Sequence, residues 1–322
     1  MRVLVTGAQG FIGRALVDAL RPGHDVIATD RDDGDIADPA HLDRLFARPL
    51  DRVFHLAAVV SGAAETDFDA GRRVNLDATL GLLDRCRAQA RRGGAVVRFL
   101  HASSIAVFGT PMPARIDDTT APAPSLSYGT HKRIAELLID DHTRRGELDG
   151  RSLRLAGVVV RPAGSGASGA RSAFNSDVIR EPLAGRDYVC PVGPAATVWL
   201  TSRRAAVANL IRLADTDGDA IGARRALTAP AFVASIAEIV AALGRVDAAA
   251  PARVRYAPQP EIEAQFGRWP RDCAFSRAEA LGLVGEASID ALVREHANAA
   301  VILSEAKDLD VPQRRDPSLR SG

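Results

Sequence analysis

Short apolar runs alternate with amphipathic segments along the first half of the chain. Residues 2–6 (RVLVT) are apolar and rich in β-branched residues, as in a buried strand, and residues 11–21 (FIGRALVDALR) place apolar residues at helical spacing. The same alternation continues, with strands predicted at 24–30, 52–60, 95–104 and 150–162 and helices at 41–47, 70–92 and 128–146. This order predicts a parallel sheet covered by helices on both faces, the doubly wound α/β class.

Composition and charge narrow the possible partners. The chain has 322 residues, of which 47% are hydrophobic and 25% are charged, with a net charge of +1. This balance is ordinary for a globular protein and supplies no basic field that would attract nucleic acid. No apolar run reaches the ~18 residues of a membrane span and no secretory signal is evident, so we expect a cytoplasmic protein without a membrane partner. The cysteines Cys86, Cys190 and Cys273 form no CxxC pair, so no metal site is predicted.

Three glycines, Gly7, Gly10 and Gly13, link the first predicted strand to the first predicted helix. Glycines at this place allow a tight turn and a close approach of the backbone to a pyrophosphate. Phe11 and Ile12 begin the helix, whose free N–H groups and dipole favour an anion. The strand–turn–helix context therefore predicts a bound dinucleotide, and the alternative is a glycine-rich turn without a ligand.

Asp30 ends the second predicted strand, about 20 residues beyond the turn, where a carboxylate accepts hydrogen bonds from ribose hydroxyls. Because its charge would repel a 2′-phosphate, Asp30 favours NAD over NADP. Arg31 follows directly and could bind a phosphate, and Asp30 could instead be a solvated turn residue. Both alternatives remain open from the sequence.

The regular alternation loosens after residue 163, where helices are predicted at 175–185, 202–214 and 235–244 among short strands. We predict a Rossmann-type NAD-binding domain over residues 1–163, with parts of the later chain packed back on it. Residues 164–302 are predicted to form a smaller α+β substrate lobe. Residues 303–322 are polar and charged and contain two prolines, which predicts a disordered tail.

Several short motifs follow one another along the chain: TGAQGFIG (6–13), GDIAD (34–38), HLAA (55–58), VNLDATLGLLD (74–84), HASSIAVFG (101–109), YGTHK (128–132) and LRLAGVVVRP (153–162). Their order and spacing resemble those of the extended short-chain dehydrogenase/reductases, a family of NAD-dependent epimerases and dehydratases. The resemblance extends over about residues 1–300. It implies an enzyme that uses NAD.

Tyr128 and Lys132 lie four residues apart, so they share one face of a predicted helix. The resemblance implies that Tyr128 is the catalytic base and that Lys132 and the positively charged nicotinamide lower its pKa. It also implies that Ser104 fixes the substrate oxygen, with Ser103 as the nearby alternative. A surface tyrosine beside a solvated lysine is the alternative to a catalytic pair.

The same resemblance implies further contacts with NAD, made to the adenine, the two riboses and the pyrophosphate. The residues concerned, besides the glycine turn and Asp30, are Asp35, Ile36, Leu56, Ala57, Ala58, Asn75, Tyr128 and Lys132. Asn75 would support the site from the long predicted helix, unless its side chain faces water.

The second half of the chain departs from the pattern of sugar-nucleotide enzymes, since Arg203 and Arg204 stand where acidic residues are usual. The chain resembles instead the D-erythronate dehydrogenases, a group of the same family, at residues 55–79, 127–141, 149–162, 179–185 and 190–192. This resemblance implies NAD-dependent oxidation of a four-carbon sugar acid at its 2-hydroxyl to the 2-oxo acid. The alternatives are a nucleotide-sugar epimerase or dehydratase with tightly held NAD, and a non-catalytic NAD(H)-binding regulator.

A small acid substrate needs a cation for its carboxylate. Arg180 is the first candidate, and Arg161, Arg203 and Arg204 compete with it, although any of them could be a solvated or structurally paired charge. Ser61 lies beyond the third predicted strand and could contact substrate hydroxyls.

The helices predicted at 70–92 and 128–146 carry apolar residues on more than one face. A second buried surface is therefore expected on both helices. In the family that these motifs resemble, the two helices often pair with their counterparts, so we predict a homodimer.

Overall fold

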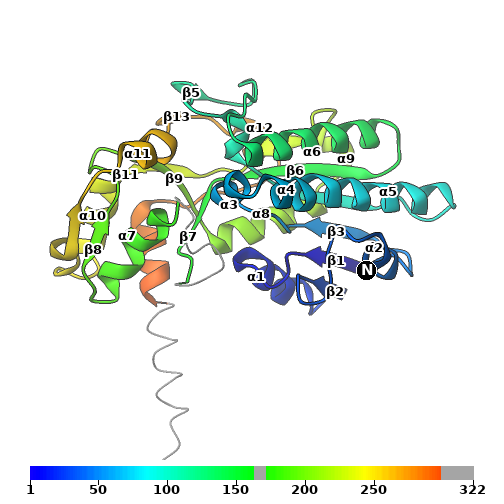
Figure 1. The fold of residues 1–322 in the computed structure, drawn as a ribbon, viewed down its shortest axis with the longest axis horizontal. Helices are drawn as coiled ribbons and strands as arrows, with labels where there is room; N and C mark the ends of the chain where they lie inside the picture. The colour runs from blue at the N-terminus through cyan, green and yellow to red at the C-terminus, as the bar shows by residue number, and fades with distance from the viewer. Residues whose placement is uncertain (163–171, 299–322) are drawn as a thin grey trace, which may run out of the picture.

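A computed structural model describes residues 1–162 and 172–298 and contains a large parallel sheet (Figure 1). The six strands run in the order β2-β1-β3-β4-β6-β10, and all their pairings are parallel. They are β1 (Arg2–Thr6), β2 (Asp25–Thr29), β3 (Arg52–His55), β4 (Arg98–Ser104), β6 (Asp149–Leu155) and β10 (Ala226–Thr228). Because β2 and β3 lie on opposite sides of β1, the order in which strands are added to the sheet reverses at β1. In sheets of this kind, ligands bind at the carboxyl ends of the strands beside such a reversal. The predicted doubly wound fold is confirmed.

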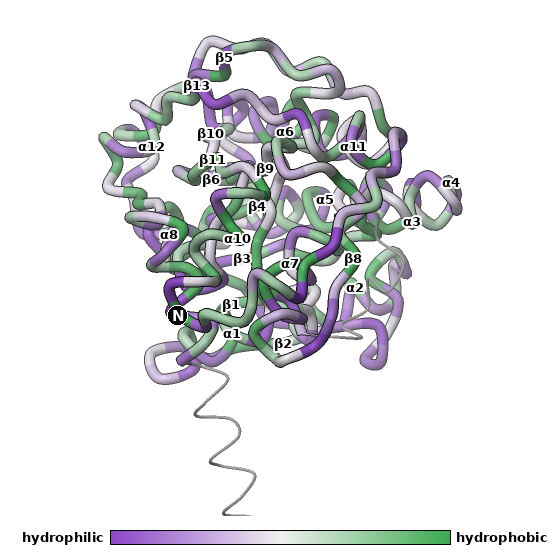
Figure 2. The backbone as a smooth tube through the Cα atoms, turned by 90° about the vertical axis from the view of Figure 1, so that its left-hand side faces the viewer, coloured by the Kyte–Doolittle hydropathy of each residue, from purple (hydrophilic) through white to green (hydrophobic). Residues whose placement is uncertain are grey.

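Helices cover both faces of this sheet. One face packs against α2 (Pro39–Leu45), α5 (Ala78–Arg91) and α6 (Ser127–Arg144), and the other packs against α1 (Phe11–Leu20) and α8 (Arg203–Asp215). Successive strand residues point to opposite faces, so Leu4 joins the first core and Val3 and Val5 join the second. In Figure 2 the hydrophobic segments gather around β1, β3 and β4, and polar loops lie at the periphery.

The long helix predicted at 70–92 is divided into three consecutive segments. These are α4 (Phe68–Arg72), a π-helical turn (Arg73–Asp77) and α5, preceded by the short α3 (Ser61–Thr66). A π-helical turn shifts the register of side chains within a helix and is frequent at functional sites.

A smaller lobe lies beyond the carboxyl end of the sheet, at the left in Figure 1. Its three-stranded sheet has the order β11-β9-β7, with β7 (Gly157–Val159), β9 (Thr197–Ser202) and β11 (Phe232–Ser235). The prediction of one strand over 150–162 is therefore wrong, because the chain leaves the large sheet at Ala156 and continues as β7 in the smaller one. This change of sheet carries Arg161 into the second lobe.

The remaining elements complete the second lobe or return to the first. α7 (Phe174–Leu183) and α10 (Ile236–Gly244) pack in the second lobe, whereas α8 packs on β4 and β6 and β10 joins the large sheet. The others are β5 (Arg115–Ile116), β8 (Tyr188–Cys190), β12 (Val254–Tyr256), β13 (Asp272–Cys273), α9 (Gly218–Ile221), α11 (Pro260–Phe266), α12 (Ser276–Ala280) and the 3₁₀ turns Ile105–Phe108 and Ala250–Arg253. The predicted tail at 303–322 lies outside the described residues.

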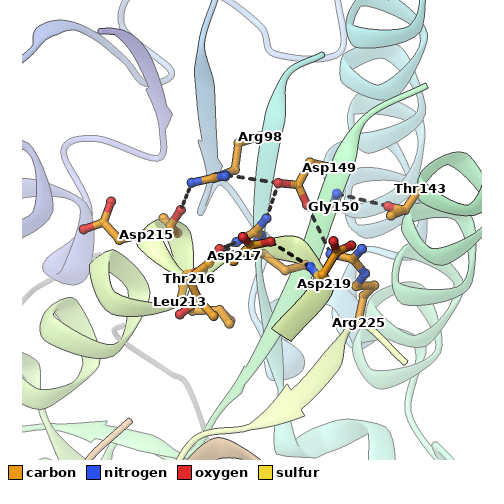
Figure 3. Close-up of polar contacts among 12 residues, drawn as sticks. Arg98, Thr143, Asp149, Gly150, Leu213, Asp215, Thr216, Asp217, Asp219 and Arg225 are labelled. Atoms are coloured by element: carbon orange, nitrogen blue, oxygen red, sulfur yellow. Dashed lines mark hydrogen bonds and ion pairs between the residues drawn. The ribbon is translucent and has the colours of Figure 1, made fainter. Parts of the chain in front are cut away.

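An arginine–aspartate network holds the amino ends of the strands together (Figure 3). Asp149, the first residue of β6, accepts hydrogen bonds from Arg98 and Arg225 at 3.1 Å each and pairs with the buried Arg151. Arg98 and Arg151 also donate to main-chain carbonyls at the C-terminal end of α8, where a positive charge is favoured. This network connects β4, β6, α8 and the residue before β10 at the amino ends of the strands, whereas the glycine turn lies at the carboxyl ends. We interpret the network as structural.

Within residues 1–162 and 172–298, no helix is both long and apolar enough to cross a lipid bilayer. The same part of the chain brings no three His, Cys, Asp or Glu side chains together in a way that could hold a metal ion. The three cysteines are free thiols.

Candidate active site

The turn between β1 and α1 leaves no room for a side chain at Gly7 or Gly13. Gly7 has a φ of +69°, and a Cβ atom there would lie 2.7 Å from the backbone nitrogen of Ala57. At Gly13 a Cβ would lie 2.0 Å from the carbonyl oxygen of Gly7, and Gly10 is the residue before α1. The first N–H groups of α1, from Phe11 to Gly13, have no intrahelical acceptor and are available to an anion. This cradle fits a dinucleotide pyrophosphate.

Asn75 fixes the segment that follows β3 beside this turn. Its side chain accepts from the N–H of Val59 at 2.8 Å and donates to the carbonyl of Val59 at 2.9 Å. Only 1% of Asn75 is exposed, so the alternative in which it faces water is wrong. Residues 56–58 are thereby held next to Gly7, and the N–H of Ala57 donates to Thr6.

The carboxylate of Asp30 lies at the end of β2 and contacts the glycine turn. It accepts hydrogen bonds from the N–H groups of Gln9 and Arg31, both at 2.8 Å. Asp35 forms an ion pair with Arg73 at the start of the π-helical turn, and Ile36 packs against the core beneath. The three residues predicted to contact the adenosine, Asp30, Asp35 and Ile36, therefore lie in the segment that follows β2.

Ser104, Tyr128 and Lys132 lie together at the carboxyl edge of the sheet. Ser104 is the last residue of β4, and Tyr128 lies in the first turn of α6 and shares a side-chain hydrogen bond with Ser104. The Lys132 ammonium lies 5.8 Å from the centroid of the Tyr128 ring. The structure therefore brings the three sequence-predicted residues into one cluster.

Burial disfavours the charged forms of both Tyr128 and Lys132. Burial raises the pKa of Tyr128, while the hydrogen bond with Ser104 and the positive charge of Arg161 act in the opposite direction. Lys132 is 2% exposed, and burial lowers its pKa to about 8, with Glu136 partly offsetting that effect. Tyr128 therefore needs further positive charge nearby before its phenol can lose a proton at neutral pH.

Ser103 is turned away from this cluster. Its hydroxyl donates to Glu136 at 2.6 Å, and Glu136 is fully buried and bound by two nitrogens of Arg154 at 2.8 Å each. Ser103 thus belongs to a buried ion-pair network, whereas Ser104 contacts Tyr128. Sequence reasoning missed Glu136 and Arg154, although charged residues on the apolar sides of a helix and a strand are a usable signal.

Two histidines beneath Lys132 were also missed. His55 and His101 come from β3 and β4 and stack with their ring centroids 5.9 Å apart. Burial and the charge of Lys132 lower the pKa of His55 to about 3 and that of His101 well below its usual range, so both rings are neutral. A histidine within the apolar run RFLHASS is the signal that the sequence offered.

Of the four candidate arginines, Arg161 is the one whose positive charge acts on Tyr128. The guanidinium of Arg180 is held by Asp177 at 2.6 Å and by Glu181 at 2.8 Å, and it also donates to the carbonyl oxygen of Arg161. Arg180, the first candidate from the sequence, is therefore already paired with two carboxylates.

The other two arginines lie on α8. The guanidinium of Arg203 lies 5.0 Å from the ring centroid of Phe11, beside the glycine turn, and Arg204 pairs with Glu286 and Glu295. Ser61 is the first residue of α3, and its side chain lies outside the described part of the structure.

Comparisons with known proteins extend this picture. The sequence profile of the NAD dependent epimerase/dehydratase family matches residues 3–193. The chain is 40% identical to a D-erythronate dehydrogenase of Cupriavidus necator, over 93% of this chain and 99% of that protein. It is 32% identical to a D-erythronate dehydrogenase of Haemophilus influenzae, over 92% of this chain and 98% of that protein. A solved structure titled as the nucleoside-diphosphate-sugar epimerase from Agrobacterium tumefaciens is 34% identical, with a TM-score of 0.85 and 94% of both chains covered.

Proposed function

This chain belongs to the NAD-dependent epimerase/dehydratase family, and from that premise we propose that it oxidises a four-carbon sugar acid resembling D-erythronate at the 2-hydroxyl. The product is the 2-oxo acid. The observation that carries the proposal is the cluster of Ser104, Tyr128 and Lys132 beside a glycine turn shaped for a dinucleotide. The full-length similarity to two proteins named D-erythronate dehydrogenase supports the choice of substrate.

The glycine turn, the segment at 56–58 and Asp30 are the residues that hold NAD in this proposal. Bound NAD⁺ supplies the hydride acceptor and a positive charge at its nicotinamide. Asp30 would accept hydrogen bonds from the adenosine ribose and would disfavour a 2′-phosphate, which would give a preference for NAD over NADP. Arg203 beside Phe11 places a positive charge near the pyrophosphate end of the site.

Tyr128 takes the proton of the 2-hydroxyl, and Ser104 holds the oxygen from which the proton leaves. The ammonium of Lys132 favours the phenolate form of Tyr128, and it would also hold the nicotinamide ribose. Burial raises the pKa of Tyr128 in the protein alone, so the added charge of NAD⁺ is needed for the phenolate to form near neutral pH.

Arg161 is our candidate for binding the substrate carboxylate. In a 2-hydroxy acid the carboxylate is attached to the reacting carbon, so the cation that binds it must lie close to Tyr128. Arg161 meets that requirement, because its charge acts on Tyr128. The role of Arg180 is then to hold Arg161 through its main-chain carbonyl, while Arg203 and Arg204 act elsewhere.

A nucleotide-sugar epimerase is the second candidate, because a structure with that title is 34% identical to this chain. Both reactions use Ser104, Tyr128 and Lys132. The absence of acidic residues at 203–204 favours the sugar acid. A non-catalytic NAD(H)-binding protein is the third candidate, and any steady NADH production excludes it.

The test is a panel of four- to six-carbon sugar acids with NAD⁺, read as NADH absorbance, next to thermal-shift titrations with UDP-sugars. We expect turnover of a four-carbon acid and no shift with UDP-sugars. Tyr128→Phe should lower kcat by about 10² or more. Arg161→Gln should raise KM for the acid by about 30-fold or more, since an unpaired buried charge costs about 2–5 kcal/mol. A UDP-sugar shift without sugar-acid turnover would favour the epimerase.

A further inference from the structure

The Lys132 ammonium has a specific partner in the protein. Its Nζ lies 3.3 Å from Nε2 of His101, and Nδ1 of the same ring lies 3.4 Å from the hydroxyl of Ser152. His101 and Ser152 are buried, on the adjacent strands β4 and β6. These two contacts connect Lys132 on α6 through His101 on β4 to Ser152 on β6.

The other charged and titratable groups around Lys132 do not hydrogen-bond it, and most of them have partners of their own. Both ring nitrogens of His55 contact threonine hydroxyls, Thr6 at 2.8 Å and Thr79 at 2.9 Å. The carboxylate of Glu136, one turn further along α6, is bound by Arg154, Arg133 and Ser103. Tyr128 shares its hydroxyl with Ser104, and His131 on the same helix is buried and feels Lys132 only as a nearby charge.

Among residues 1–162 and 172–298, His101 is the one side chain within hydrogen-bond distance of the Lys132 ammonium. A neutral ring that donates from Nδ1 to Ser152 presents a lone pair at Nε2, and an ammonium can only donate. Burial and the charge of Lys132 keep His101 neutral, so this acceptor persists across the working pH range.

We propose that His101, oriented by Ser152, is a positioning residue that accepts a hydrogen bond from Lys132 and holds its ammonium charged and directed at the site. The inference deepens the proposed function and rests on it, since it concerns the lysine paired with Tyr128. An ammonium has three donors, so one hydrogen bond to His101 leaves two for the ribose of NAD and for Tyr128.

The composition of the chain allows a direct test. Lys132 and Lys307 are the only lysines in the sequence, while all other basic side chains apart from histidine are arginine. A sample labelled with ¹³C and ¹⁵N in lysine therefore gives two side-chain signals, and the Lys132→Met variant identifies which signal belongs to Lys132. The pKa of Lys132 can then be titrated in the cofactor-free, full-length protein.

His101→Met removes the acceptor and keeps a side chain of similar length, whereas His101→Gln keeps a carbonyl oxygen near the place of Nε2. We expect His101→Met to lower the pKa of Lys132 by about one unit, since a hydrogen bond to a charged group has been lost. His101→Gln should leave it within a few tenths of the parent value. Ser152→Ala should also lower the pKa of Lys132, because the ring is then free to adopt the tautomer that protonates Nε2.

Activity supplies the second readout. With His101→Met, kcat/KM for the sugar acid should fall roughly tenfold at pH 7, and the pH at which it reaches its plateau should rise; His101→Gln should restore both. An unchanged lysine titration in folded His101→Met and Ser152→Ala would overturn the proposal, as would equal losses in the Met and Gln variants. A parent enzyme that oxidises no sugar acid would refute the proposed function, while the lysine titration would still decide the role of His101.

Discussion

Replacing Lys132 with Met should stabilise the fold while it abolishes turnover. The folded protein buries this ammonium almost completely, and the pKa of Lys132 falls from 10.5 to about 8. At about 1.4 kcal/mol per pKa unit, the charged lysine reduces the free energy of unfolding at pH 7 by about 3 kcal/mol. Met fills similar space without charge, so Lys132→Met should regain an amount of that order. Such a gain is typical when a buried catalytic charge is removed.

The pH dependence follows from the sign of this shift. The unfolded chain keeps the Lys132 proton up to a pKa of about 10.5, whereas the folded protein loses it near a pKa of about 8. Between these values the unfolded state binds more protons, so the stability of the parent protein rises with pH relative to the variant. The advantage of Lys132→Met is therefore complete below pH 8 and disappears above pH 10.5.

Urea denaturation at pH 7 and at pH 10 measures both effects. Arg144→Met is the matched control, because Arg144 lies on the same helix with 73% of its side chain exposed and should change stability little. The reasoning is refuted if Lys132→Met is less stable than the parent at pH 7. A gain that is equal at the two pH values would also contradict it, because the gain would then arise from packing rather than from charge.

Three further outcomes follow from the same geometry. Asp30→Ala should reduce the ratio of kcat/KM with NAD⁺ to kcat/KM with NADP⁺. Equal kcat/KM with the two cofactors in the parent enzyme would show that Asp30 does not select for the ribose hydroxyls of NAD⁺. Ser104→Ala should lower kcat by about 10² with little change in thermal stability. Ser103→Ala should instead lower the free energy of unfolding by about 1–3 kcal/mol, because Glu136 then loses a hydrogen-bond donor. The reverse pattern would exchange the roles of the two serines. Light scattering at micromolar concentration should give a dimer mass, reduced to a monomer by Leu137→Glu on α6, where Leu137 is 51% exposed; a monomeric parent would rule out the dimer.

The periodicity of the chain predicted five strands of the large sheet, β1, β2, β3, β4 and β6, because each lies in a mainly apolar segment that alternates with an amphipathic helix. It did not show that the run at 150–162 changes sheets at Ala156, since the run reads as one strand and only tertiary pairing separates its two halves. The position of β10 was missed for the same reason. Three residues far along the chain complete the large sheet without a local signal.

For the candidate site too, the sequence predicted local features but not the contacts that depend on tertiary packing. Spacing within the sequence was enough to place Gly7 in a turn and Tyr128 and Lys132 on one helix, because the turn and the helix are local structures. The partners of Lys132 and Arg161 come from other strands and helices, so their roles depend on packing that a single sequence does not show. Arg180 is the opposite case, since its partners Asp177 and Glu181 lie three residues before it and one residue after it on the same predicted helix, so spacing alone could have shown that its charge is paired.

Deuterium transfer from specifically labelled D-erythronate tests the central proposal most directly. The purified protein is incubated with NAD⁺ and D-erythronate deuterated at C2, and in parallel with the C3-deuterated acid, and the NADH formed is analysed by mass spectrometry. Oxidation at the 2-hydroxyl predicts deuterated NADH from the first substrate and unlabelled NADH from the second. Label arriving only from C3, or no NADH from either acid, would contradict the proposed reaction.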